Sequence, residues 1–269
     1  MATTAPAYAQ GQTANGDQRY WSGWFDRSDR AKAEQPHWIT PLATTTPRLE
    51  QEFRYDLAWQ RELDGTRSEN YGNGKGLELI PFDKMEVIFG VPPYLVHNQS
   101  DVQDGFGDVR VLVKYRLLSA NEQTGNYIMT AFMDVSFPTG SGSNGATNAV
   151  VTPTLAYGKG LGRFDVQGTF GVAFPTGHVN VIGRTYIWNN AVQYQLWRRL
   201  WPELEVNGTF FQDGKNDGKK QVLVTPGLVV GRFPLSQRVA LTIGAGLQVA
   251  LSQFRTSTHN LILSVRLPF

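Results

Sequence analysis

From Arg48 to the end of the chain, apolar and polar residues alternate with a period of two, and clusters of Gly, Asn, Asp and Pro interrupt the alternation at intervals. The pattern is clearest over residues 239–251, where every second residue is apolar and those between are mostly small or polar. A period of two is typical of β-strands whose two faces meet different surroundings. The pattern therefore predicts a chain of strands joined by turns.

Twelve strands are predicted by this alternation. They fall at residues 48–60, 76–81, 85–95, 108–118, 127–137, 149–157, 163–174, 184–197, 203–212, 220–230, 238–252 and 259–269. Connections after odd-numbered strands, such as 61–75, are mostly long, and those after even-numbered strands are mostly tight, with 119–126 as an exception. An even number of strands with long loops at one end and short turns at the other is typical of outer-membrane β-barrels.

The aromatic residues of the apolar face form two predicted bands. Those near the long connections are Trp59, Phe137, Phe174, Tyr186 and Trp188, and those near the short turns are Tyr115, Tyr127, Tyr157, Phe164, Tyr194 and Phe269. Amphipathic rings gather at the two interfaces of a bilayer. The bands therefore favour an all-β fold, a twelve-stranded antiparallel transmembrane barrel, over a soluble lipocalin-like barrel or a sandwich.

Charged residues occupy the other face of several predicted strands. In the first strand five charges share one face, and a core without water or counter-charges would not tolerate them. The residues predicted to face the lumen are Arg48, Glu50, Glu52, Arg54, Asp56, Glu86, Arg110, Lys114, Arg116, Asp134, Asp165, Glu205, Arg238 and Arg266. They can pair with one another and brace the barrel, they can form a transverse field along a solute path, or they can do both. The field would lie between a basic cluster and an acidic cluster, which are Arg110, Lys114 and Arg116 on one side and Glu50, Glu52 and Asp56 on the other. A twelve-stranded pore would be narrow.

Composition removes several classes of protein. The chain has 269 residues, a formal net charge of +2 and no cysteine. Scattered Lys and Arg argue against a nucleic-acid surface, and the lack of cysteine excludes disulfides and zinc–thiolate sites. No run of about 18 apolar residues predicts a transmembrane helix.

The N-terminal region lacks the alternation. Residues 1–10 contain a small-x-small tripeptide and are interpreted as the remnant of an export signal. Residues 11–47 are polar with scattered tryptophans and are predicted to form an irregular extension, either periplasmic or plug-like. Residues 48–269 are the predicted barrel domain.

Several stretches resemble a known family. Those that carry the resemblance are 37–42 (HWITPL), 46–54 (TPRLEQEFR), 105–109 (GFGDV), 114–117 (KYRL), 213–214 (DG) and 225–227 (TPG). They are similar to the family called the meta-pathway of phenol degradation, which implies an outer-membrane channel for small molecules. The terminal alternation that ends at Phe269 resembles the assembly signal of outer-membrane proteins. The family name does not establish phenol as the solute.

Catalysis and ion binding receive little support. His97, His178 and His259 lie at or beside long-connection ends, where barrel enzymes carry Ser/His or Asp/His sets, but no motif spacing joins them to a nucleophile. The string 158–162 is predicted to be a turn, and 213–218 lacks the bidentate glutamate of a calcium loop. The sequence predicts no enzyme activity, no cofactor and no metal site.

Together these patterns lead to a functional hypothesis. The chain is predicted to be a monomeric channel of the bacterial outer membrane for passive diffusion of small solutes, aromatic or anionic compounds among them. Its expected partners are membrane lipid and lipopolysaccharide, the barrel-assembly machinery and the solutes. One alternative is a closed structural or adhesive barrel whose lumen is filled by side chains or by residues 11–46. The other is a barrel lipid hydrolase or protease.

Overall fold

The structure is a computed structural model that describes residues 20–269. The predicted signal remnant, residues 1–10, lies outside the described residues, as do 11–19 of the predicted extension. The described chain begins near helix α2 (Trp24–Ala33) and passes through residues 34–51 into the sheet. In this part of the chain no helix has both the length and the hydropathy of a membrane span.

Fifteen strand segments follow, all in one sheet. They are β1 (Glu52–Glu62), β2 (Arg67–Gly72), β3 (Gly76–Phe82), β4 (Met85–Gly90), β5 (Tyr94–His97), β6 (Gly105–Phe106), β7 (Val109–Ala120), β8 (Tyr127–Phe137), β9 (Val150–Leu161), β10 (Phe164–Pro175), β11 (Arg184–Tyr194), β12 (Leu200–Gln212), β13 (Lys220–Pro234), β14 (Ala240–Ala250) and β15 (Ser257–Pro268). Between them lie helix α3 (Val179–Ile182) and the 3₁₀ turns η1 (Gly142–Asn144) and η2 (Gly214–Asn216).

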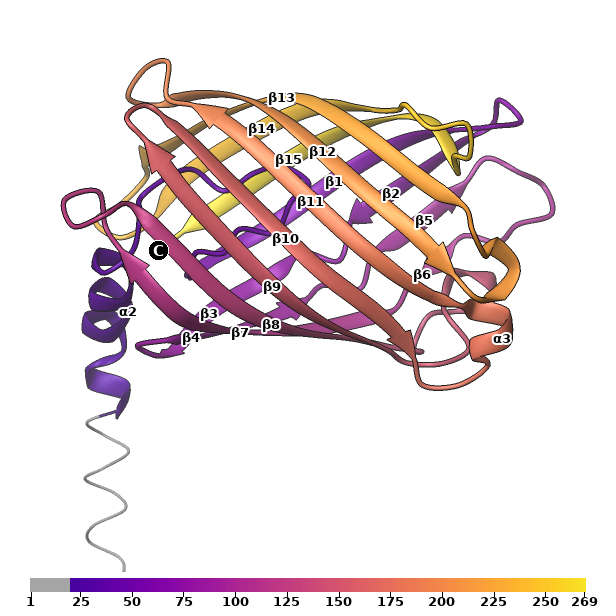
Figure 1. The fold of residues 1–269 in the computed structure, drawn as a ribbon, viewed down its shortest axis with the longest axis horizontal. Helices are drawn as coiled ribbons and strands as arrows, with labels where there is room; N and C mark the ends of the chain where they lie inside the picture. The colour runs from indigo at the N-terminus through magenta and orange to yellow at the C-terminus, as the bar shows by residue number, and fades with distance from the viewer. Residues whose placement is uncertain (1–19) are drawn as a thin grey trace, which may run out of the picture.

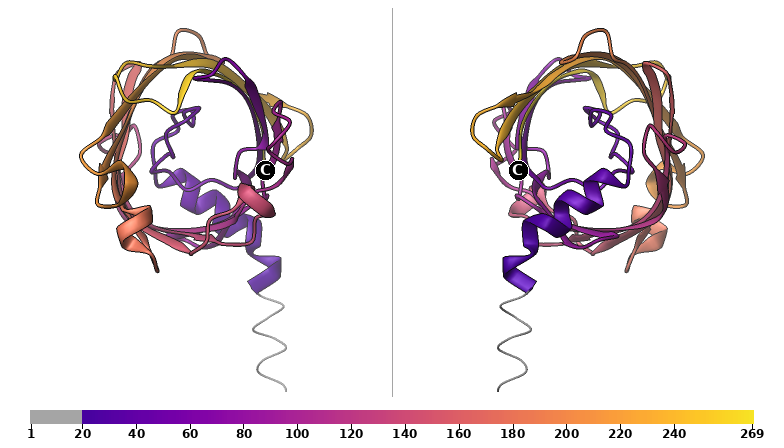
Figure 2. Two further views of the ribbon diagram at one scale, coloured as in Figure 1. Left: turned by 90° about the vertical axis from the view of Figure 1, so that its right-hand side faces the viewer. Right: turned by 90° about the vertical axis from the view of Figure 1, so that its left-hand side faces the viewer.

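The sheet closes on itself, as Figures 1 and 2 show. Strand β1 pairs antiparallel with β15 from Glu52↔Pro268 to Glu62↔Ser257, and successive strands pair antiparallel around the ring. Three neighbouring strands of the barrel are each broken into two segments. The first consists of β2 and β3, the second of β4 and β5, and the third of β6 and β7. Counting each broken strand once gives twelve, which confirms the predicted closed antiparallel barrel.

The breaks lie side by side in the wall. Residues 73–75 interrupt the first broken strand, where Gly72 and Gly74 have φ values of +100° and +67°. Residues 91–93 interrupt the second and contain two prolines, which have no N–H to offer the sheet. The predicted long connection 61–75 was therefore wrong in part, because it contains β2. That strand is polar, and so it lacks the alternation that marks a strand in lipid.

The predicted parity of the strands is the observed one. On β14 the side chains of Ile243 and Leu247 are 41% and 44% exposed on the outer face, whereas Thr242 and Gln248 face inward and are 2% and 9% exposed. Because the exposed face is apolar and carries aromatic bands at both ends, it fits hydrocarbon between two interfaces. We refer below to the two ends of the barrel as the short-turn end and the long-loop end.

Candidate functional site: the filled lumen

Residues 34–50, which we call the inner segment, run inside the barrel. Figure 2 shows this indigo coil within the ring of strands, and α2 crosses the short-turn end. Most of the segment is buried, with Leu42 at 1% and Thr44 at 0% exposure. Its position explains why the strands carry inward polar groups, because a backbone without regular structure needs hydrogen-bond partners when it is buried.

Two carboxylates of β12 bind the N–H groups of the deepest bend. The oxygens of Glu205 accept hydrogen bonds from the backbone N–H groups of Ala43 (2.7 Å) and Thr44 (2.6 Å). Glu203 accepts from the N–H of Leu42 at 3.1 Å. The two bonds to the Glu205 carboxylate are charge-assisted and lie where water is largely excluded, so they are among the stronger contacts available to the segment.

Two guanidinium groups bind the carbonyl oxygens of the same bend. Arg54 of β1 donates to the carbonyls of Pro41 (3.3 Å) and Leu42 (2.5 Å). Arg266 of β15 donates to the carbonyls of Thr40 and, at 2.8 Å, Pro41. The bend is thus held by acidic groups on its donors and by basic groups on its acceptors, and we call Arg54, Glu203, Glu205 and Arg266 the clamp.

Leu42 itself packs into a bed of glycines on β13 and β14. A Cβ atom built at Gly227, Gly244 or Gly246 would come within 2.6, 2.5 or 2.8 Å of a Leu42 methyl carbon, respectively. Such approaches are closer than real Cβ contacts allow, so the missing side chains are what make room for Leu42.

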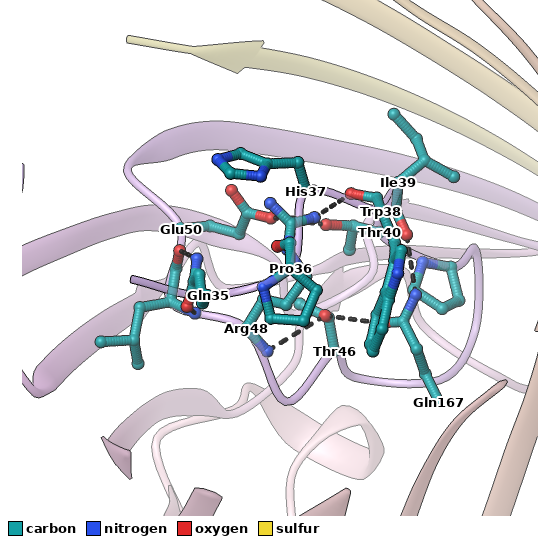
Figure 3. A network of polar contacts seen from close by, with 12 residues as sticks. Gln35, Pro36, His37, Trp38, Ile39, Thr40, Thr46, Arg48, Glu50 and Gln167 are labelled. Carbon is teal, nitrogen blue, oxygen red and sulfur yellow. Dashed lines mark hydrogen bonds and ion pairs between the residues drawn. The ribbon is translucent and has the colours of Figure 1, made fainter. Parts of the chain in front are cut away.

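The two arms of the inner segment bind each other (Figure 3). Arg48 donates to the carbonyls of Pro36, at 2.6 Å, and Trp38, and it forms an ion pair with Glu50 at 2.9 Å. Gln35 and Leu49 exchange two hydrogen bonds, 2.8 and 2.9 Å long. The segment is therefore a folded hairpin with its own contacts. Arg48 and Glu50 belong to this hairpin, because β1 begins only at Glu52.

Gln167 of β10 fixes the hairpin to the wall. Its amide nitrogen donates to the carbonyl of Ile39 at 2.9 Å, and its oxygen accepts from the hydroxyl of Thr46 at 2.7 Å. Figure 3 shows Gln167 beside both arms. A neutral amide can serve a donor and an acceptor at once, which suits a position between the two arms.

Several of the other predicted charges form ion pairs with close partners, whereas Glu52 and Asp165 are buried without one. The ion pairs are Arg54–Asp56 at 2.7 Å, Lys114–Glu86 at 2.9 Å, Arg116–Glu34 at 2.5 Å and Arg110–Asp134. Lys114 also donates to the Arg48 carbonyl at 3.1 Å, and Glu86 accepts from the Glu50 N–H at 2.6 Å. Each basic residue of the predicted cluster has its own acidic neighbour, so the contacts favour bracing over a field between the clusters.

Arg238 and Phe269 lie at the short-turn end. Arg238 is in the β13–β14 turn, where its guanidinium binds Asp29 of α2 at 2.8 Å and lies over the Phe25 ring. Its predicted place in the lumen was therefore wrong, because β14 begins two residues later, at Ala240. The backbone of Phe269 donates to the Gln51 carbonyl at 2.9 Å and accepts from Lys32 at 3.1 Å. Its predicted role in assembly stays a prediction.

The turn between β7 and β8 holds the start of the inner segment. The hydroxyl of Ser119 and the amide of Asn121 donate to the carbonyls of Glu34 and Ala33, and Glu122 accepts from the N–H of His37 at 2.5 Å. Partial burial raises the pKa of Glu122, but the N–H and ring of His37 outweigh this and leave the pKa below its ordinary value of 4.5. These contacts give a reason for the unusual length of 119–126.

Two cavities lie on opposite sides of the inner segment. At the long-loop end a vestibule of about 460 Å³ reaches Leu42 and Ala43 and is lined by Lys75, Arg110, Glu62, Glu69 and several amide side chains. A cavity of about 210 Å³ at the short-turn end is lined by residues 37–39, Glu122 and Arg232, among others. The inner segment thus contributes to the lining of both cavities and lies between them.

Several residues of this site were not singled out from the sequence. Glu203 and Gln167 have the inward parity of their strands, so the alternation could have found them. Lys75 sits in the break between β2 and β3, where no period exists to reveal it. Arg232 adopts a left-handed backbone, φ 62°, at a bulge and donates to the carbonyls of His37 and Trp38.

The three histidines at the long-loop end do not converge. His97 and His178 each contact an asparagine, Asn144 and Asn148, at 2.7 Å, and His259 contacts Thr258 at 3.2 Å. Among residues 20–269 no group of three or more His, Cys, Asp or Glu side chains could hold a metal ion.

A closed twelve-stranded antiparallel barrel with an apolar outer face and a polar lumen is the fold of outer-membrane channels, and solved structures agree. The COG4313 outer membrane channel from Pseudomonas putida F1 superposes with a TM-score of 0.61 and 14% identity, covering 86% of this chain and 100% of that one. A NanC porin structure superposes with a TM-score of 0.52 and 10% identity, covering 81% and 98%. Identities this low show the fold alone.

The family follows from the sequence. A family model described as "MetA-pathway of phenol degradation" matches residues 57–254, which is more than half of the chain, so the protein belongs to this family. The resemblance seen in the sequence is confirmed, although the matched residues begin after the inner segment. A comparison with functionally curated proteins found no match.

Proposed function

We propose that this protein is a channel of the bacterial outer membrane through which small solutes diffuse passively, and that the structure represents its closed state. The observation that carries the proposal is the pair of cavities separated by residues 38–43. A barrel built only for structure has no need of a vestibule of about 460 Å³ that ends at a removable hairpin. The inner segment acts as the plug, and the 12-stranded wall acts as the pore.

Charge and shape of the vestibule favour a class of solute. Lys75 and Arg110 line it together with Glu62 and Glu69. Arg110 is paired with Asp134, whereas Lys75 has no carboxylate within ion-pair distance among the described residues. Leu42, Leu95 and Ile262 supply apolar surface in the same cavity. A cation beside apolar side chains suits a small carboxylate with an aromatic or aliphatic body, which is compatible with the phenol-degradation description of the family. We therefore propose small organic anions as solutes.

A reversible lock tests the channel and its plug together. The side chains of Thr44 and Asn207 are in contact, with 3.3 Å between the hydroxyl and the amide nitrogen. Because the chain has no cysteine, the double variant T44C/N207C introduces one possible disulfide. In a planar bilayer we expect silence after oxidation and discrete conductance steps after reduction. The single variants T44C and N207C, which lack the bond, should not respond to reductant.

Reversal potentials under a salt gradient test the solute class. We expect an anion preference that weakens in K75Q and R110Q, and a larger fraction of benzoate current in the unaltered channel than in K75Q. E52Q is the matched control, because Glu52 is buried on β1 and lines neither the vestibule nor the cavity at the other end. An equal shift in E52Q would contradict the assignment of selectivity to the vestibule.

The second candidate, a closed structural barrel, is favoured by the dense hydrogen bonding of the inner segment. If folded, reduced T44C/N207C never conducts, the plug does not leave the lumen and the channel proposal fails. Heat-modifiable migration on a detergent gel would verify folding in both cases.

A further inference from the structure

An aromatic patch lies at the short-turn end, outside the lumen. Four rings in mutual contact form its centre, those of Tyr20, Trp21, Trp24 and Phe82. Phe25 follows Trp24 on α2, and its ring lies under the guanidinium of Arg238. Trp21, Phe25 and Phe82 are 67%, 41% and 56% exposed, and the Trp21 and Trp24 rings stack with centroids 5.8 Å apart. Large exposed aromatic groups that are contiguous usually mark a surface that another phase or molecule covers.

The patch is continuous with the lipid-facing band of the barrel. The Tyr20 hydroxyl donates to the Pro81 carbonyl at 3.2 Å, and its ring lies 6.4 Å from that of Phe82. Phe82 ends β3, and Met85 across the turn pairs with Tyr115, whose ring is 52% exposed in the band at the short-turn end. The aromatic surface therefore extends from the barrel wall onto the residues that lead into α2.

The helix has the orientation of an interfacial helix. Figure 1 shows α2 across the end of the barrel, roughly perpendicular to its long axis, with its first residues projecting beyond the edge formed by β3 and β4. A helix perpendicular to the barrel axis is parallel to the bilayer plane. Helices that lie in a membrane interface bury aromatic and apolar side chains at the boundary between headgroups and acyl chains.

We propose that the aromatic patch inserts into the phospholipid headgroup region of the leaflet at the short-turn end and anchors α2 to the membrane. The guanidinium of Arg27 lies 4.3 Å from the Tyr20 ring centroid and 5.1 Å from that of Trp24, which holds the rings in place. Arg30 pairs with Asp83 of the β3–β4 turn at 3.4 Å, next to Phe82. Lipid thus contacts the first half of the helical region.

The barrel holds the second half of the helix. Arg116 donates to the Ala31 carbonyl at 2.5 Å, and the Asp29–Arg238 ion pair ties α2 to the β13–β14 turn. The inner segment leaves from this fixed base at residue 34. Lipid contact at the patch is independent of whether the barrel conducts.

Site-directed spin labelling tests the contact in the full chain. Since the chain has no cysteine, W21C and F25C each carry one label, and A33C places a label at the exposed opposite end of α2. The protein is reconstituted in phosphatidylethanolamine–phosphatidylglycerol vesicles. We expect labels at 21 and 25 to collide more with oxygen, which concentrates in lipid, and the label at 33 to collide more with a water-soluble nickel chelate.

Two outcomes would overturn the proposal. Labels at 21 and 25 that are as accessible to the nickel chelate as the label at 33 would show the patch in water. Labels protected from both reagents would show that a protein surface, such as a second copy of the chain, covers the patch. Neither outcome depends on conductance, so failure of the anchor is distinguishable from failure of the channel.

Discussion

Replacement of Glu205 by alanine should release the plug. The carboxylate is fully buried and accepts two backbone hydrogen bonds, from Ala43 and Thr44, at 2.7 and 2.6 Å. Each hydrogen bond to a charged group contributes about 1.5–3 kcal/mol. With the lower value of this range, the two hydrogen bonds together stabilise the inserted hairpin by about 3 kcal/mol. This free energy corresponds to about a 100-fold change in the ratio of released to inserted states.

Single-channel recording measures this ratio as the frequency and duration of open events. We expect E205A to open about 100-fold more often than the unaltered protein, on the same energy scale. E205Q should lie between them, because its amide oxygen can still accept one bond. It also keeps the volume of the side chain, so it remains informative if E205A does not fold.

The matched control is Q221A. Gln221 faces the lumen from β13 and is buried, but its hydrogen bond runs to Thr256 and not to the inner segment. Its removal alters the lumen without touching the clamp, so its opening frequency should match that of the unaltered protein. If folded E205A opened no more often than Q221A, the clamp would not hold the plug and the energetic reasoning would be refuted.

Three further predictions concern other parts of the structure. I243R should destabilise the barrel by about 2–4 kcal/mol in lipid, because Ile243 faces hydrocarbon, whereas inward Q248R should cost less; equal urea midpoints would contradict the parity. G244A should displace the Leu42 side chain and increase opening. G218A is the control: the added Cβ has no atom within 4 Å, and although the φ of +73° makes the substitution strained, it should leave conductance unchanged. The pKa of Glu122 is lowered in the folded protein, so its contact with His37 stabilises the inserted hairpin fully at pH values above 4.5, the ordinary pKa of the group. This stabilisation is lost as the pH falls through the lower pKa of the folded state. Opening should therefore rise at acidic pH, and E122Q should lose that pH dependence.

The histidine prediction remains open to experiment. The structural matches are channels and porins, and the described contacts of His97, His178 and His259 join them to Asn or Thr side chains. If this protein were a barrel hydrolase, changing one of these histidines to alanine would abolish activity on lipid or peptide substrates. Assays of the unaltered protein and the alanine variants on these substrates therefore test the hydrolase alternative.

The sequence by itself determined the barrel. Every lipid-facing strand must present apolar residues at alternate positions, so twelve strands, their parity and both aromatic bands were visible without coordinates. Predicted strand 127–137 coincides with β8, and Ile243 and Leu247 face outward as expected. Boundaries failed where the wall leaves the bilayer, as in polar β2, because a strand in water needs no alternation.

Only the tertiary structure decided what the inward charges do. Arg54, Glu205 and Arg266 are far apart in the sequence, and the alternation says that they face inward but not that they meet residues 40–44. The inner segment has no period because its hydrogen bonds run to side chains of the wall and between its own two arms, and not to a neighbouring strand. Its place depends on closure of β1 against β15, which brings the two ends of the sheet around it. Local pattern therefore fixes the wall, and long-range closure fixes what the wall encloses.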